Sequence, residues 1–163
     1  MILILHNIRS VHNVGSIFRT ADAAGVSSII LSGYSPAPID RFGRARSDFT
    51  KVSLGAEKTV PWVYTQTLGP TLKKLRAAGC FVAAIEQDPR SQNLFDFSFP
   101  PHLSIEKVAL VLGNEVRGVS ASVLEKCDVI LEIPMHGTKE SLNVSVTAGI
   151  ALFTLRNRVR QTL

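Results

Sequence analysis

Short apolar runs alternate with longer amphipathic stretches along the whole chain. The runs are apolar throughout rather than at every second residue, which is typical of strands buried on both faces of a mainly parallel sheet. They lie at Ile2–Leu5, Ser28–Leu31, Phe81–Ile85, Val108–Leu112 and Val129–Ile133. The stretches between them predict helices at about Val14–Ala24, Leu68–Ala78, Val119–Lys126 and Leu142–Arg158. This alternation predicts an α/β fold in which helices flank a mainly parallel sheet.

The segment Gly33–Pro61 shows no clear periodicity and carries many Gly, Pro, Ser and Arg residues. Because no second apolar core follows it, we expect a long functional loop with a short helical turn rather than a linker. A chain of 163 residues is long enough for one substantial core. We therefore expect a single domain over residues 1–163.

The composition limits the class of protein. Hydrophobic residues make up 45% of the chain and charged residues 19%, which is typical of a globular protein rather than a disordered one. No apolar run approaches the roughly 18 residues that cross a bilayer. The opening MILIL lacks the basic start and the cleavage site of a signal peptide, so it predicts a buried strand. We expect a cytoplasmic protein without membrane contacts.

Basic residues exceed acidic ones by 18 to 13, which gives a formal net charge of +5. Four of them gather in one segment, at Arg41, Arg44, Arg46 and Lys51. Such a cluster suits a polyanionic partner, but it is equally typical of an ordinary solvated surface. The sequence leaves both interpretations open.

Cysteine and histidine are too scattered to indicate a metal site. Cys80 and Cys127 lie far apart without a CxxC motif, and the 4 histidines share no ligand spacing. We expect two reduced, buried cysteines and no bound metal.

Three separated blocks combine small or turn-forming residues with polar ones at the edge of an apolar run. The first, NIRSVHNVGSIFRTADAAG, covers residues 7–25. Its apolar positions repeat at helical spacing, with Asn13 as a candidate N-cap and Gly25 as a natural stop. Arg19 lies well off the apolar face, so it can reach a ligand while its neighbours anchor the helix. An ordinary exposed arginine is the alternative.

The second and third blocks each place a glycine-bearing turn after a buried strand. They are VALVLGNEVRG at residues 108–118 and IPMHGTKESLNVSVTAGI at residues 133–150. Open α/β sheets usually bind ligands at this end of their strands. Gly113 and Gly118 let the backbone approach a ligand closely, and either Ser141 or Asn143 could cap the last helix. Neither a GxGxxG fingerprint nor a GxxxxGK[ST] phosphate loop is present.

The last predicted helix is apolar on two sides. One side carries Leu142, Val146, Ile150 and Phe153, and another carries Val144, Ala148, Ala151 and Leu155. The domain itself can cover one side. A second subunit is the economical candidate for the other.

In order and spacing, the three blocks resemble motifs 1, 2 and 3 of the SpoU (TrmH) family of RNA ribose 2′-O-methyltransferases, within the SPOUT superfamily. The resemblance extends from Met1 to about Arg158. It implies a SPOUT-type sheet with a deep C-terminal trefoil knot, although knots are nearly absent from proteins in general. It also implies S-adenosylmethionine (SAM) as methyl donor, an RNA ribose as acceptor, and a homodimer with a composite active site.

The resemblance also implies roles for individual residues. It assigns catalysis to Arg19, with Glu115, Ser141 and Asn143 as further polar site residues. It implies that SAM is held at Leu112, Gly113, Asn114, Ile133, Met135 and Leu142, with Ile85 and Glu86 as weaker candidates. We expect RNA contacts from Asn13, Arg19, Arg44, Arg46 and Lys51. Structural roles remain as alternatives for Glu115, as a brace, and for Ser141, as a helix cap.

Two chemical roles are open for Arg19. The family assignment is often phrased as a general base, yet a guanidinium with a pKa above about 12 is very rarely deprotonated in a protein. Its planar fork of donors suits a clamp that holds a phosphate and favours a developing 2′-alkoxide. Both roles require Arg19 to reach the ribose.

We therefore predict SAM-dependent methylation of an RNA ribose 2′-hydroxyl. The EQDPRSQNL segment and the SLNVS form of the third block favour tRNA, on a D-loop guanosine, over rRNA. Many family members carry an additional RNA-binding domain, which we do not expect here. The alternative is a catalytically silent RNA-binding or SAM-binding module of the same fold. The complete polar set argues for an enzyme.

Overall fold

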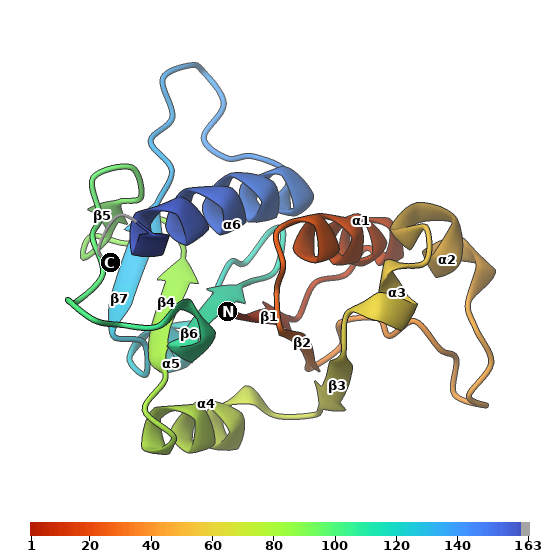
Figure 1. Ribbon diagram of the computed structural model, residues 1–163. Helices are drawn as coiled ribbons and strands as arrows, with labels where there is room; N and C mark the ends of the chain where they lie inside the picture. Colours follow the sequence, from red (N-terminus) through yellow and green to blue (C-terminus); the bar gives the residue numbers. More distant parts are fainter. Residues whose placement is uncertain (161–163) are drawn as a thin grey trace.

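In the part of the chain that the computed structural model describes, residues 1–160, a 7-stranded sheet forms in the order β3-β2-β1-β6-β4-β7-β5 (Figure 1). Every pair of neighbouring strands is parallel. The strands are β1 Ile2–His6, β2 Ser28–Ser32, β3 Trp62–Thr65, β4 Phe81–Ile85, β5 Gln92–Asn93, β6 Val108–Leu112 and β7 Val129–Glu132. The helices are α1 Val11–Ala23, α2 Ser47–Ser53, α3 Ala56–Thr59, α4 Leu68–Ala77, α5 Ala121–Leu124 and α6 Val144–Arg160, with a 3₁₀ turn at Ile105–Lys107.

Helices cover both faces of the sheet. The helices α1, α2, α3 and α6 lie on one face, and α4 and α5 on the other (Figure 1). The central strand β6 is buried at all of its five positions, because each face of it meets a helical layer. This explains its uninterrupted apolar sequence. The predicted α/β class with a mainly parallel sheet is confirmed, whereas the trefoil knot stays a prediction.

The apolar runs became strands as predicted, but two further strands lie at the edges of the sheet. In β3, the short apolar run Trp62–Tyr64 was not predicted as a strand; Val63 and Tyr64 are more than half exposed, because β3 lies at the edge of the sheet. The other edge strand, β5, has only 2 residues. The predicted helix Val119–Lys126 is shorter than expected, because only Ala121–Leu124 is helical.

The segment predicted as one long loop contains two short helices, α2 and α3. Phe49 of α2 is fully buried and packs edge-on against Phe18 of α1, with ring centroids 5.2 Å apart. A helix of 7 residues is marginal on its own, so its stability comes from this packing.

Helix α1 begins earlier than predicted and uses a different cap. Its N-cap is Ser10, whose hydroxyl oxygen accepts a hydrogen bond from the backbone N–H of Asn13 at 3.2 Å. The predicted Asn13 cap is therefore wrong, because Asn13 lies inside the first turn. Gly25 follows the helix with a φ of 65°, which confirms it as the stop.

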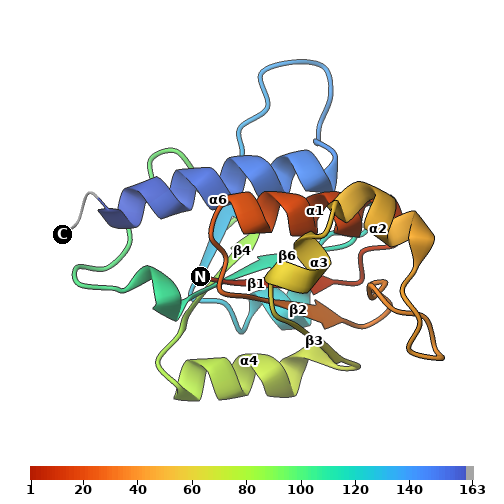
Figure 2. The ribbon, with the colours of Figure 1, turned by 45° about the vertical axis from the view of Figure 1, so that its right-hand side comes forward.

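The last helix, α6, lies beside α1 across the same face of the sheet (Figures 1 and 2). Its Val144, Ala148, Ala151 and Leu155 are buried against the domain, whereas Val146 and Phe153, with Leu142 just before the helix, are 40 to 49% exposed. Ile150, predicted on the same side as these three, is partly buried against the core. The two apolar sides predicted from the sequence are thus real, and the described chain covers one of them.

Candidate active site

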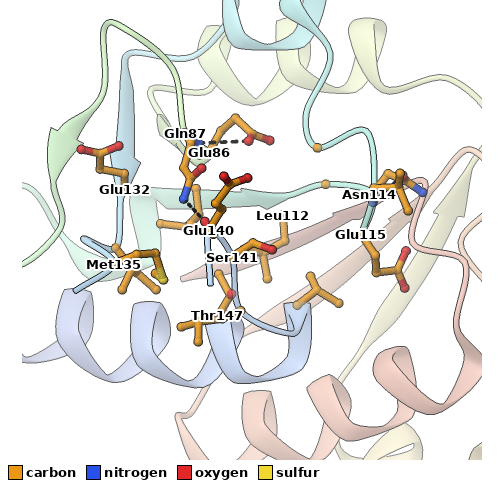
Figure 3. Close-up of a pocket in the computed structure, with 17 residues that line it drawn as sticks. Glu86, Gln87, Leu112, Asn114, Glu115, Glu132, Met135, Glu140, Ser141 and Thr147 are labelled. Atoms are coloured by element: carbon orange, nitrogen blue, oxygen red, sulfur yellow. Dashed lines mark hydrogen bonds between the residues drawn. The ribbon is translucent and has the colours of Figure 1, made fainter. Parts of the chain in front are cut away.

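A cleft of about 310 Å³ lies where β4, β6 and β7 end, beneath the loop that leads into α6 (Figure 3). Because all strands are parallel, the segments that follow them meet at this one edge of the sheet. The seven predicted cofactor residues all line the cleft: Ile85, Leu112, Gly113, Asn114, Ile133, Met135 and Leu142. The polar candidates Glu86, Glu115 and Ser141 line it too.

The turn after β6 forms the wall of the cleft and depends on Gly113. Asn114 and Gly118 exchange two backbone hydrogen bonds, at 3.1 and 2.9 Å, which closes the turn. A Cβ on Gly113 would lie 2.5 Å from the carbonyl carbon of Gly118, a distance that real Cβ atoms essentially never show. Glycine is therefore required at position 113 for backbone to pack on backbone.

The buried side chain of Asn114 holds this turn in place rather than facing a ligand. Its Oδ1 accepts hydrogen bonds from the backbone N–H groups of Val116 and Arg117, at 2.9 and 2.7 Å. Its Nδ2 donates to the backbone oxygen of Asn7 at 2.9 Å and to the Tyr34 hydroxyl at 3.0 Å. Asn114 thus lines the cleft with its amide fully engaged in structure.

Two side chains after β4 tie the rim of the cleft together. Glu86 accepts a hydrogen bond from the backbone N–H of Val119 at 2.6 Å, so it fixes the far end of the turn. Gln87 donates from Nε2 to the backbone oxygen of Glu140 at 2.5 Å, which links β4 to the loop before α6 (Figure 3). The sequence prediction named Glu86 but missed Gln87 and Glu140. For Gln87, its position just after a buried strand could have indicated the role; for Glu140, no sequence signal was present.

A chain of hydrogen bonds joins the three sequence blocks at the side of the cleft. Asn13 donates from Nδ2 to Glu115 at 3.0 Å and accepts from Nδ2 of Asn143 at 3.2 Å. Asn143 in turn accepts from the backbone N–H and the hydroxyl of Ser145, at 2.8 and 2.7 Å. Asn143 is therefore the cap of α6, and the alternative cap, Ser141, makes no such bond.

Glu115 braces the start of α1. Its carboxylate accepts hydrogen bonds from the backbone N–H groups of Arg9 at 3.0 Å and Ser10 at 3.2 Å, in addition to the Asn13 amide. Partial burial raises the pKa of this carboxyl, but the hydrogen bonds outweigh burial and hold the pKa of Glu115 below its ordinary value. A structural role for Glu115 is thus visible, and a chemical role remains a proposal.

We expect Glu115→Gln to lower the free energy of unfolding by about 1 kcal/mol at neutral pH, the low end for bonds to a charge because the carboxylate is partly exposed. A lowered folded pKa means that the carboxylate stabilises the fold above its ordinary pKa and loses this effect as the pH falls through the lowered value. Urea unfolding should therefore show that the free energies of unfolding of variant and wild type become equal below about pH 4. A constant difference at all pH values would contradict this account.

A second, shallower hollow of about 630 Å³ adjoins the cleft. It is lined by Arg9, Ser10 and Asn13 from the start of α1 and by Asn143 from the start of α6. The two hollows share Glu115, Val116, Ser141, Leu142 and Val144. A ligand in the cleft and a ligand in the hollow would meet at this shared wall, as a transfer reaction between two substrates requires.

Arg19 lies on an exposed part of α1 and outside the lining of both hollows. Its side chain makes no hydrogen bond or ion pair with any residue that the structure describes. The helix thus presents a guanidinium without a partner in residues 1–160, as predicted, but this guanidinium does not reach the cleft of its own chain.

The predicted basic RNA-binding residues are partly neutralised within their own segment. Arg44 pairs with Asp40 and Arg46 with Asp48, at 2.9 and 2.8 Å. Hydrogen bonds from Arg46 hold the pKa of Asp48 low. Lys51 is exposed on α2. This segment therefore carries less unpaired positive charge than its sequence indicates.

Residues 1–160 show neither a cluster of metal-ligating side chains nor a membrane-spanning helix. No group of three or more His, Cys, Asp or Glu side chains in this part of the chain is arranged to hold a metal ion. None of its helices is long and apolar enough to span a membrane. Both cysteines are free thiols, and burial raises the pKa of Cys127 to about 11.

The chain is thus an α/β protein whose parallel sheet carries two adjoining hollows at its carboxyl edge. The sequence matches the model of the SpoU rRNA Methylase family over residues 1–153. The chain therefore belongs to the SpoU methylase family, and the predicted resemblance is confirmed.

Curated relatives carry a similar sequence within longer chains. This chain is 38% identical over 160 residues to the 23S rRNA (guanosine-2′-O-)-methyltransferase RlmB of Neisseria meningitidis, covering 98% of this chain and 59% of that protein. It is 35% identical over 157 residues to RlmB of Pseudomonas aeruginosa, covering 95% and 58%. The chain thus spans slightly less than three fifths of the length of these two relatives.

Solved structures agree with the fold. The A. aeolicus TrmH/SpoU tRNA modifying enzyme superposes with a TM-score of 0.82 at 26% identity, over 98% of this chain and 75% of that one. The AdoMet-bound rRNA methyltransferase from Sinorhizobium meliloti gives 0.81 at 28% identity, over 99% and 56%.

Proposed function

We propose that the protein transfers a methyl group from SAM to a ribose 2′-hydroxyl of RNA. The observation that carries this proposal is the shared wall of the cleft and the hollow, which brings two ligands into contact beside the Asn13–Glu115–Asn143 network. The names of the relatives support the same chemistry: those cited above include 23S rRNA (guanosine-2′-O-)-methyltransferases and an AdoMet-bound rRNA methyltransferase.

The residues of the cleft fit SAM. Its apolar side chains suit an adenine, and the turn that forms its wall is held compact by the backbone packing at Gly113. Carboxylates of Glu86, Glu132 and Glu140 also line it, and they complement the positive charge of the cofactor. SAM would be held by Ile85, Leu112, Gly113, Ile133, Met135 and Leu142, with Asn114 shaping the turn. When bound, SAM supplies an electrophilic methyl group on a sulfonium.

The protein's own residues orient the acceptor. In this proposal the ribose occupies the shallow hollow, where Asn13, Ser141 and Asn143 present polar groups to it. Arg19 holds the adjacent phosphate and stabilises the negative charge that develops on the 2′-oxygen, because its guanidinium stays protonated. Glu115 acts by holding Asn13 and the start of α1 in position.

Among RNA classes, we propose rRNA as the favoured substrate. The sequence alone favoured tRNA, but the curated relatives cited above are both 23S rRNA enzymes. A tRNA-modifying enzyme is among the similar structures, so both fractions belong in the test.

The first experiment is transfer of labelled methyl groups from SAM to purified rRNA and tRNA fractions by the purified protein. We expect alkali-stable label at ribose positions, strongest in rRNA. Label confined to bases would contradict the proposal, and SAM binding without turnover on any RNA fraction would favour the silent binding module instead.

We further propose that the protein acts as a homodimer with a composite active site. The exposed side of α6, formed by Leu142, Val146 and Phe153, is an apolar strip that a second copy would cover. Arg19 lies outside the lining of its own chain's hollows, so it is available to complete the site of the partner.

Mixing two inactive variants tests this arrangement. If the site takes Arg19 from one chain and Asn143 from the other, an Arg19→Ala chain mixed with an Asn143→Ala chain forms heterodimers with one intact site. Equal mixing should restore about a quarter of wild-type activity, since about half of the dimers are mixed and each has one intact site of two. If the subunits exchange but no activity returns, each active site is formed by one chain alone. If the protein sediments as a monomer, the proposed dimer is wrong.

A further inference from the structure

Two tyrosines near the candidate active site have an unusual orientation. Tyr34, which follows β2, is 57% exposed, and Tyr64, at the end of β3, is 52% exposed. The Tyr34 hydroxyl accepts a hydrogen bond from Nδ2 of the buried Asn114 at 3.0 Å. The Tyr64 hydroxyl donates to the backbone oxygen of Gly33, the residue before Tyr34. Both hydroxyls are thus tied to the protein.

An exposed tyrosine usually buries part of its ring and turns its hydroxyl to water, because the ring is the apolar end. Here the polar ends are anchored, whereas each residue as a whole stays more than half exposed. The hydrogen bonds also restrict the rings before any ligand arrives, which lowers the entropy lost on binding. The arrangement suits a flat partner that covers aromatic faces.

The position of these rings points to the acceptor. All strands run parallel, so Tyr34 and Tyr64 lie at the same carboxyl edge as the two hollows. The loop from β2 to α2 extends from this edge (Figure 2). Asn114, which Tyr34 contacts, is followed directly by Glu115, which lines both hollows.

The charge around the rings favours a nucleic acid over a protein surface. Arg9, exposed, lines the shallow hollow. In the loop after Tyr34, the Arg41 guanidinium lies 4.7 Å from the centre of the exposed Phe42 ring; that of Arg44 lies 5.0 Å from it and is also paired with Asp40. Aromatic faces interleaved with cations are the usual surface for unpaired nucleic acid, since every base has a face that can stack.

We propose that Tyr34 and Tyr64 form a stacking platform for unpaired RNA bases next to the nucleotide that is methylated. This inference rests on the proposed function, because it assigns the platform to the acceptor RNA. The platform binds single strands in preference to duplex, since paired bases do not expose their faces to it.

The test is binding of a fluorescent oligoadenylate of about twelve nucleotides, measured by anisotropy, with an RNA duplex of the same length for comparison. We expect Tyr34→Ala to raise the Kd for the single strand about 5- to 150-fold, the range measured for loss of one stacked base. Tyr34→Phe keeps the ring and should raise the Kd less. Tyr64→Ala should act in the same direction, and affinity for the duplex should change little.

Phe95→Ala is the matched control, because Phe95 is 41% exposed, follows the opposite edge strand β5, and lines neither hollow. SAM affinity, measured by calorimetry, should be unchanged in all variants, which shows that the Asn114 turn is intact. An unchanged Kd in the Tyr34→Ala/Tyr64→Ala double variant would overturn the platform, as would a wild-type protein that does not bind the single strand. Conversion of a wild-type dimer to monomers by Tyr34→Ala would assign the rings to a protein interface and also overturn it.

The proposed function and the platform fail in different ways. If the wild-type protein transfers no methyl group but Tyr34→Ala abolishes oligoadenylate binding, the platform is supported and the proposed function is wrong. If the protein methylates RNA and binds it equally well without the two rings, the proposed function is supported and the platform is wrong.

Discussion

Replacing Arg19 by alanine is expected to lower the rate of methyl transfer about 100- to 1000-fold, the usual cost of removing one donor to a developing charge. SAM affinity should stay the same, because Arg19 lines neither hollow of its own chain. The fold should also tolerate the change, since Arg19 is exposed and has no hydrogen-bond partner in residues 1–160. Single-turnover transfer and calorimetry on the same preparation measure the two quantities.

The matched variant is Arg19→Lys, which keeps the charge but replaces the planar fork by a single ammonium group. It should restore little activity if the guanidinium holds a phosphate through two parallel bonds. Loss of SAM binding in Arg19→Ala would contradict the division between cofactor cleft and RNA-directed helix.

Replacing Gly113 by alanine is expected to weaken SAM binding about 10- to 100-fold, because an added methyl group in packed surroundings costs about 1 to 3 kcal/mol. The new Cβ would meet only backbone: the carbonyl group of Gly118 at 2.5 and 2.6 Å and the nitrogen of Val119 at 2.6 Å. No side chain can rotate away, so the turn itself must move. Calorimetry with SAM measures the loss.

Gly69→Ala is the control for this substitution. Gly69 lies in α4, on the face of the sheet opposite α1 and α6 (Figure 1), and an added Cβ there would meet nothing within 4 Å. This variant should bind SAM as the wild type does. Wild-type affinity in Gly113→Ala would show that the cofactor does not depend on the close packing of this turn.

The parts of the fold that were predictable from sequence are those with local causes. Strand β6 is apolar because both of its faces are buried, and Gly25 ends α1 because its backbone is left-handed. Helix α2 was predicted only as a helical turn without a position, because its stability depends on Phe49 packing against Phe18, a contact between distant segments. Strand β3 was not predicted because its apolar run, Trp62–Tyr64, is short and lies at the exposed edge of the sheet.

The same division applies to the candidate site. The turn after β6 and the cap of α6 are local features, and the predicted cofactor residues line one cleft. The partners of polar side chains are not local: Asn13 and Glu115 are 102 positions apart, and Asn13 and Asn143 are 130 apart. The sequence prediction assigned Asn13 to the cap of α1, which is Ser10, and missed the bonds of Asn13 to Glu115 and Asn143.

The most direct measurement is a map of 2′-O-methyl positions on total RNA from cells with and without this gene. The account predicts that at least one ribose methylation, in rRNA ahead of tRNA, disappears without the gene. The wild-type gene should restore it, and an Arg19→Ala copy should not. An identical map in both cells, or restoration of the missing position by the Arg19→Ala copy, would contradict the account.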